Sequence, residues 1–204
     1  MKILNEFVPT RKFLKLAEEI KDLVDGWNVT DSAAGFPAPS GTVVSCVLKS
    51  KYPEKEIVPI FILHYTGPVE VIAIGLAPGE LLLESVVAAV KEHDIQNGVV
   101  VSGIATLKVA HMHHITHDHF PPDDRFFTIA KPLEVSNISG IIADGQPHLH
   151  MTVGYRDEWA VAGHLEPGCE VLYLAEVVIL KFNGMALQRH LDTERRIKLL
   201  GSKI

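Results

Sequence analysis

The chain has 204 residues, 47% hydrophobic and 22% charged, so it can bury a sizeable core without the support of disulfides. Its two cysteines, Cys46 and Cys169, lie far apart and form no C-x-x-C pair, which excludes a disulfide framework and indicates a reduced, cytoplasmic setting. Its apolar runs are too short to span a bilayer, and its first residues lack the profile of a signal peptide.

The net charge of −6 is unevenly distributed along the chain. Residues 1–66 carry eight basic and eight acidic side chains, whereas residues 67–204 carry 11 basic and 17 acidic ones. Because proteins bind DNA through Lys and Arg that neutralise phosphates, this balance disfavours DNA as a partner. The tail holds the one candidate DNA contact, although its composition favours an ordinary solvated surface: Arg189, Arg195, Arg196, Lys198 and Lys203.

The first 66 residues predict a small βαβαβ-like segment. Apolar residues at helical spacing over 14–24 predict a helix, and Trp27–Thr30 predicts a short strand after it. A loop rich in Gly and Pro then precedes a second short helix, and residues 57–63 have the apolar run of a buried strand. Strands separated by helices favour a parallel arrangement.

The pattern changes at Gly67, where we place the boundary between an N-terminal segment (1–66) and a second domain (67–204). Residues 78–93 predict one helix with an apolar stripe. Strands are predicted at 98–101, 105–109, 133–139, 148–153 and 171–182. We therefore expect an α/β (α+β) fold in which one main helix accompanies a mixed, largely antiparallel sheet.

Two histidines in the segment PHLHMTV (147–153) form a candidate metal site. On a strand, His148 and His150 point to the face opposite Leu149 and Met151, with Cα atoms about 6.5 to 7 Å apart. This spacing suits two ligands of one ion, and His164, after a predicted turn, is the candidate third. Three neutral imidazoles with one open position favour zinc. An isolated H-x-H pair also occurs in structural or surface roles, so that alternative stays open.

Five of the 11 histidines lie in the run from His111 to His119. On a strand His111 and His113 share one face and His114 points to the other, so at most part of the run can converge on one ion. The run predicts either an extension of the first site, a second metal site, or a solvated loop that binds metal opportunistically.

Several segments resemble, in order and spacing, the PPC (plants and prokaryotes conserved) domain over about 135 residues: GELL (79–82), LEVSNISG (133–140), PHLHMTV, AGHLEPGCEV (162–171) and LAEVVIL (174–180). The resemblance implies a small α/β domain that forms homotrimers, with its histidine cluster near a subunit interface and metal in some members. Plant members carry AT-hooks and act in the nucleus. The sequence has no Arg-Gly-Arg-Pro hook, so the part of a DNA-binding assignment that depends on hooks does not transfer.

Two glutamates are candidates to hydrogen-bond the metal ligands. Glu176 shares a predicted strand face with Leu174 and Val178, and a carboxylate on an apolar face must be paired, protonated or metal-bound. A contact at a trimer interface explains it equally well. The resemblance places Glu134 on an interior strand in the same role.

These observations favour a trimeric metal-binding module with a DNA-binding or regulatory role and no membrane partner. One alternative is a metal-dependent hydrolase or lyase acting on a small molecule, in which Glu134 or Glu176 moves protons. Another is a structural trimer without catalysis. No organic cofactor is expected.

The N-terminal segment resembles the opening of methylenetetrahydrofolate reductase, through Leu4 to Pro9, the helix after it, Asn28 to Ser32, and residues 57–60. Glu6 matches by position a glutamate that acts in catalysis in that family. A barrel of that kind needs about 250 residues, so no flavin or folate site is expected here.

Overall fold

A computed structural model describes residues 27–30, 37–38, 41–42, 47–50 and 63–203 of the chain. Internal contacts divide the chain into two compact units, residues 1–66 and 67–204. In the first unit, β1 (Trp27–Thr30) pairs with β4 (Val47–Ser50), and β2 (Pro37–Ala38) pairs with β3 (Gly41–Thr42).

The strand predicted at Trp27–Thr30 is present, but its pairing with β4 is antiparallel rather than parallel. Between β1 and β4 the described residues form the short antiparallel pair β2–β3. β4 itself lies where a second short helix was predicted. The helix predicted at 14–24 and most of the strand predicted at 57–63 lie outside the described residues.

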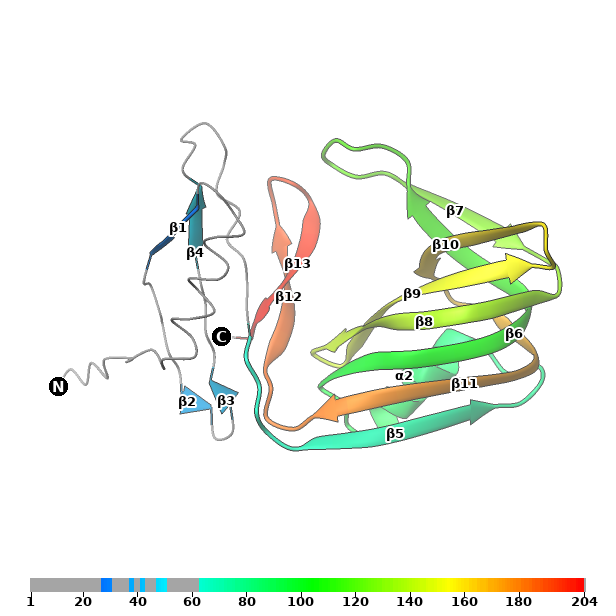
Figure 1. Cartoon of the computed structure of the whole chain (residues 1–204), viewed down its shortest axis with the longest axis horizontal. Helices are drawn as coiled ribbons and strands as arrows, with labels where there is room; N and C mark the ends of the chain where they lie inside the picture. The colour runs from blue at the N-terminus through cyan, green and yellow to red at the C-terminus, as the bar shows by residue number, and fades with distance from the viewer. Residues whose placement is uncertain (1–26, 31–36, 39–40, 43–46, 51–62, 204) are drawn as a thin grey trace. The chain divides into compact units, whose positions relative to one another are not determined.

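The second unit is a curved antiparallel sheet with one helix in its described residues (Figure 1). The strands run in the order β10–β9–β8–β6–β11–β5, and β7 also pairs with β6. A separate hairpin follows the sheet. The elements are β5 (Val69–Leu76), α2 (Leu82–Glu92), β6 (Asn97–Ile115), β7 (Asp124–Ile129), β8 (Leu133–Ala143), β9 (Gln146–Tyr155), β10 (Trp159–Leu165), β11 (Glu170–Phe182), β12 (Leu187–Asp192) and β13 (Ile197–Ser202).

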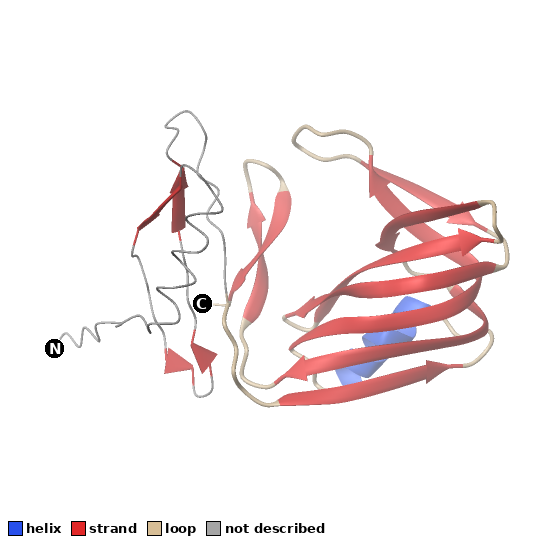
Figure 2. Ribbon diagram, viewed as in Figure 1, coloured by secondary structure: helices blue, strands red, loops and turns tan. Residues whose placement is uncertain are grey.

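This arrangement confirms the largely antiparallel sheet and the main helix expected for residues 67–204. Figure 2 shows α2 against one face of the sheet. The helix buries Leu82, Val86 and Val90 in the core because these residues form a single stripe at helical spacing. No helix among the described residues has the length and hydropathy to cross a membrane.

The sheet face opposite α2 carries exposed apolar side chains. Val71 on β5, Ile104 on β6 and Leu174 on β11 are 68%, 47% and 46% exposed. Cross-strand pairing places Ile104 opposite Glu176. Leu174 lies in the irregular part of β11 just before Ala175 and is exposed beside them. This face, defined by Val71, Ile104, Leu174 and Glu176, is hereafter the open face.

The long strand β6 closes the sheet on itself. Its first part pairs with β8 and β11, and its last part pairs with β7 and with β10. The β6–β10 contact consists of two pairs, His164 with His113 and Leu165 with Met112. A Cβ at Gly163 would lie 2.6 Å from the carbonyl oxygen of His113, so only glycine permits this approach. The seam between β6 and β10 positions the site described next.

Candidate metal centre

The structure brings His148, His150 and His164 together. His148 and His150 lie on β9, and His164 lies on β10 as the direct cross-strand partner of His150. The His164 ring is 4.9 Å from the His148 ring and 5.4 Å from the His150 ring, between centroids. These histidines share a face because residues two apart on a strand, and direct partners across two strands, project the same way.

The spacing of the nitrogens suits a bound ion. The Nε2 atoms of His148 and His150 are 3.3 Å apart. Two nitrogens on one tetrahedral zinc, each bonded at about 2.0 to 2.1 Å, are separated by about 3.3 to 3.4 Å. Without an ion, the same distance accommodates a hydrogen bond in which one imidazole N–H donates to the other ring. The nitrogens of His148 and His150 therefore fit zinc, a metal that imidazole donors suit. In the described residues, the three side chains whose ligand atoms all lie within 4.8 Å of one another are His113, His164 and Glu166.

The surroundings of His148 and His150 disfavour their charged forms. Burial, followed by the neighbouring His164, lowers the pKa of His148 to about 4, and Arg189 contributes to the same shift. The Arg189 guanidinium donates to the carbonyl oxygens of Ile141 and Gln146. Burial and His164 also lower the pKa of His150. A neutral imidazole has a free lone pair, which a metal ligand requires.

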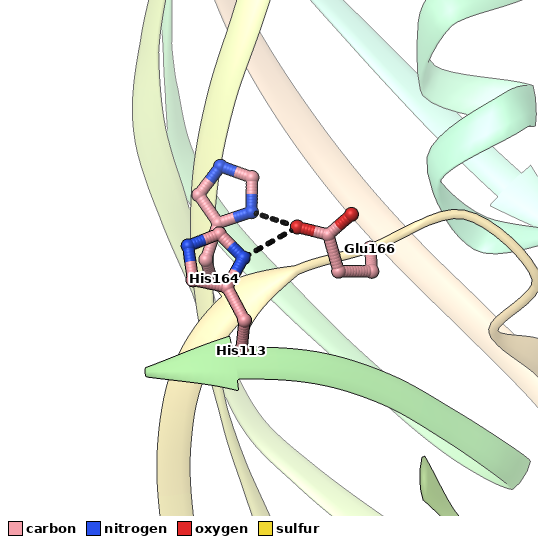
Figure 3. Close-up of side chains that lie close together, drawn as sticks. All are labelled: His113, His164 and Glu166. Carbon is pink, nitrogen blue, oxygen red and sulfur yellow. Dashed lines mark hydrogen bonds and ion pairs between the residues drawn. The ribbon is translucent and has the colours of Figure 1, made fainter. Parts of the chain in front are cut away.

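A carboxylate that sequence reasoning missed contacts the cluster. Glu166 Oε1 accepts hydrogen bonds from His113 Nδ1 at 2.6 Å and from His164 Nδ1 at 2.8 Å (Figure 3). These three side chains are only 20 to 23% exposed. Glu166 follows His164 by two positions, and residues two apart in an extended chain point to the same side, so this spacing could have predicted their contact. His113 joins only through the β6–β10 register, which the sequence does not reveal.

The turn that carries Glu166 is fixed to β6 and α2. The Glu166 N–H donates to the carbonyl oxygen of His111 at 3.1 Å, and the His111 N–H donates to Cys169 Sγ at 3.2 Å. The Gly168 N–H donates to Glu84 Oε1 on α2. Cys169 is fully buried, and burial raises the pKa of its thiol to about 11. Cys169 therefore stays a thiol and anchors the turn rather than serving as a thiolate ligand.

Glu134 and Glu176 lie away from the histidines within one chain. Glu134 on β8 is five residues from Ser139, the partner of His150, which corresponds to about 16 Å along the strand. Glu176 lies on β11, three strands from β9, which corresponds to about 14 Å along the sheet. Their role beside the metal ligands stays a prediction. In the described part of the chain, the carboxylate bonded to His164 belongs to Glu166.

The run from His111 to His119 splits between several environments. His113 joins the cluster, whereas His111 Nδ1 lies 2.8 Å from the Thr128 hydroxyl oxygen. The His114 ring packs on Phe127 with centroids 5.1 Å apart. In the loop beyond β6, the rings of His117 and His119 stack with centroids 3.6 Å apart. The prediction that only part of the run can converge on one point therefore agrees with its geometry.

The basic tail is largely engaged with its own domain. Arg189 binds the carbonyl oxygens named above, Arg195 pairs with Asp192 at 3.0 Å, and Lys203 pairs with Asp144. Because these basic side chains are already paired, the tail is better explained as an ordinary surface than as a phosphate-binding patch.

Residues 40–183 match the family model of the Plants and Prokaryotes Conserved (PCC) domain. The match begins 27 residues before the boundary placed at Gly67. Among curated proteins, the bifunctional protein GlmU of two Synechococcus strains is similar, with 29% identity over 118 residues and 26% over 114. These matches cover 55 and 56% of this chain, which spans 17% of the length of either relative.

Three solved structures have the same fold. A plant- and prokaryote-conserved protein from Pyrococcus horikoshii has a TM-score of 0.56 and 22% identity, over 68% of this chain and 98% of its own. A metal-containing protein from Archaeoglobus fulgidus has a TM-score of 0.55 and 22% identity, over 64% and 91%. A candidate DNA-binding protein from Ralstonia eutropha has a TM-score of 0.54 and 22% identity, over 64% and 90%. Together with the family match, the fold shows that this chain belongs to the Plants and Prokaryotes Conserved domain family.

Proposed function

We propose that this chain is a metal-binding module that holds one divalent ion through the Nε2 atoms of His148, His150 and His164. Zinc is the ion that suits these donors best. The main support for this proposal is that the Nε2 atoms of His148 and His150 lie 3.3 Å apart. The His164 ring lies next to them, 4.9 Å from the His148 ring between centroids. That the similarly folded A. fulgidus protein is metal-containing supports it. A zinc ion in this place would supply a Lewis acid and a fixed positive charge.

We further propose that the module is a homotrimer assembled through the open face. Val71, Ile104 and Leu174 expose apolar surface on a sheet face that α2 does not cover. Contiguous exposed apolar surface of this kind marks an interaction site. Second and third copies of this chain are the partners that the family resemblance implies. Burial there would also give Glu176 the apolar surroundings expected from its sequence context.

One observation favours a second candidate, a hydrolase or lyase that acts on a small molecule. A cavity of about 410 Å³ lies beside the turn that carries Glu166. Glu166 and Phe126 belong to its lining, so the cavity adjoins the carboxylate that contacts His164. Its size lies within the range of small-molecule sites. A substrate in this cavity would lie against the Glu166 carboxylate, which contacts His164 at Nδ1, on the ring edge away from Nε2.

DNA binding is the weaker alternative. The similarly folded R. eutropha protein is named for it, but residues 67–204 carry excess negative charge. In addition, Arg189, Arg195 and Lys203 are already paired. A regulatory role that depends on metal or on a small ligand agrees better with these charges.

Metal analysis of the full chain, purified without a histidine tag, tests the proposal. We expect about one zinc per chain in the unmodified protein and less than about a tenth of that after His148→Ala combined with His150→Ala. The combination His117→Ala and His119→Ala is the matched control, because it removes another stacked H-x-H pair. The proposal is wrong if the first variant retains as much zinc as this control.

A further inference from the structure

The cluster of His113, His164 and Glu166 is not explained by a centre made of three histidines. We propose that Glu166 and His113 complete the centre: Glu166 orients His164 through one carboxylate oxygen and also holds His113 as a fourth nitrogen donor to the same ion. This inference rests on the proposed function. It adds a positioning residue and a ligand that the H-x-H pattern does not contain.

The hydrogen bonds determine which nitrogens carry the lone pair, and Nε2 of His113 also lies 3.9 Å from Asp124 Oδ1. An ionised carboxylate only accepts, so Nδ1 of His113 and Nδ1 of His164 must both carry hydrogen when they bond to Glu166 Oε1. In each neutral ring the lone pair then resides on Nε2. A carboxylate behind a histidine fixes its tautomer and raises its basicity as a metal ligand. Glu166 does this for two histidines at once.

The stacking of the two rings determines where the free nitrogens point. The rings of His113 and His164 lie 4.5 Å apart between centroids, with 21° between their planes. Because both Nδ1 atoms meet the same oxygen, the opposite edges of both rings turn away from Glu166 together (Figure 3). His164 also has His148 and His150 as ring neighbours, and His113 stacks on His164 itself.

A different arrangement, with the ion directly between His113, His164 and Glu166, fits less well. Two donor atoms on one zinc ion lie about 2.9 to 3.4 Å apart for bond angles of 90 to 110°. The Glu166 oxygen lies 2.6 and 2.8 Å from the two nitrogens, which is the range of charge-assisted hydrogen bonds. Glu166 therefore acts behind the histidines and not as a ligand itself.

Four imidazoles fill the coordination of a tetrahedral ion and leave no position for water. A four-nitrogen centre is therefore structural, and a catalytic one would keep an open position. The number of nitrogen donors thus distinguishes the leading function from the hydrolase or lyase alternative.

The test measures zinc affinity by competition with a chromophoric chelator, and the visible absorption of the cobalt-substituted protein, on the untagged full chain. We expect Glu166→Gln to weaken zinc binding about 10- to 100-fold and Glu166→Asp to recover part of the loss. We expect His113→Ala to weaken binding by more than about 10-fold and to shift the cobalt absorption bands. His114→Ala, which alters the next residue on the same strand, is the matched control and should change neither quantity.

Melting of each variant in the presence of chelator separates loss of metal binding from loss of fold. If His113→Ala and Glu166→Gln match the control while His148→Ala loses zinc, the fourth donor and the orienting carboxylate are wrong and the three-histidine centre stands. If the unmodified chain binds no zinc, both proposals fail. A weakened Glu166→Gln beside an unaffected His113→Ala would overturn the role of His113.

Discussion

His113 and His164 are direct cross-strand partners, and their rings stack with centroids 4.5 Å apart. The strands that carry them meet only because residue 163 is glycine. A bulkier residue there would move β10 away from β6 and separate the two rings.

We therefore predict that Gly163→Ala destabilises the protein by about 1 to 3 kcal/mol and lowers its zinc affinity, since the added Cβ collides with backbone. Gly154→Ala is the control, because a Cβ on that β9 residue would be 3.7 Å from its nearest neighbour. Urea unfolding with chelator gives the stability, and chelator competition gives the affinity. Equal effects of the two substitutions would show that the seam tolerates a side chain at residue 163.

We predict that Cys169 makes the stability fall at high pH. Burial holds the folded pKa at about 11, against 9.0 when unfolded. The unfolded state therefore releases this proton first as the pH rises. The contribution is complete below pH 9 and is lost between about pH 9 and 11, on the order of 2 to 3 kcal/mol.

Urea unfolding of the unmodified chain and of Cys169→Ala at pH 8 and pH 10.5 measures this effect. The advantage of the unmodified chain should shrink at the higher pH. A constant difference between the two proteins would mean that the thiol has its ordinary pKa in the folded state.

We predict that His148 titrates far below a free histidine in the metal-free protein. Its folded pKa is about 4, against 6.5 when unfolded, chiefly because of burial. The unfolded chain binds more protons between these values, so this group's contribution to stability is present above pH 6.5 and is lost as the pH falls towards 4. Imidazole NMR with selective labelling and His148→Ala for assignment measures the pKa. A midpoint at 6.5 would contradict the partial desolvation of this ring.

We predict that Ile104→Lys dissociates the proposed trimer, because a charge on the open face would have to be desolvated in the interface. Val87→Lys is the matched control: Val87 is 45% exposed on α2, against 47% for Ile104 on the sheet. Light scattering behind a sizing column gives the mass. A trimer that survives Ile104→Lys unchanged would place the interface elsewhere.

The sequence predicted the parts of the site that depend on local geometry. The period of a strand places His148 and His150 on one face, and the structure has them there. His164 came from the family resemblance, because its position opposite His150 depends on strand pairing. Glu166 was not predicted, and His113 was predicted only as one of several histidines in a run that could extend the site, because the contact between β6 and β10 joins residues about 50 positions apart.

Strand pairing also explains why the first unit differs from the parallel arrangement predicted for residues 1–66. The parallel order assumed helical crossovers, whereas β1 and β4 pair antiparallel. Strand alternation predicted which sheet face carries Glu176. The same pattern does not show that this face is exposed to solvent in a single chain.

The seam between β6 and β10 consists of two residue pairs, and the proposed ion would join histidines on both sides of it and on β9. An ion that binds only the closed form stabilises it by about 4 kcal/mol when its concentration is a thousand times its dissociation constant. The supply of zinc would then set how often the closed sheet opens. Amide hydrogens of β10 would exchange quickly in zinc-starved protein and slowly in zinc-replete protein, so that this domain would record the metal status of its surroundings in its backbone dynamics.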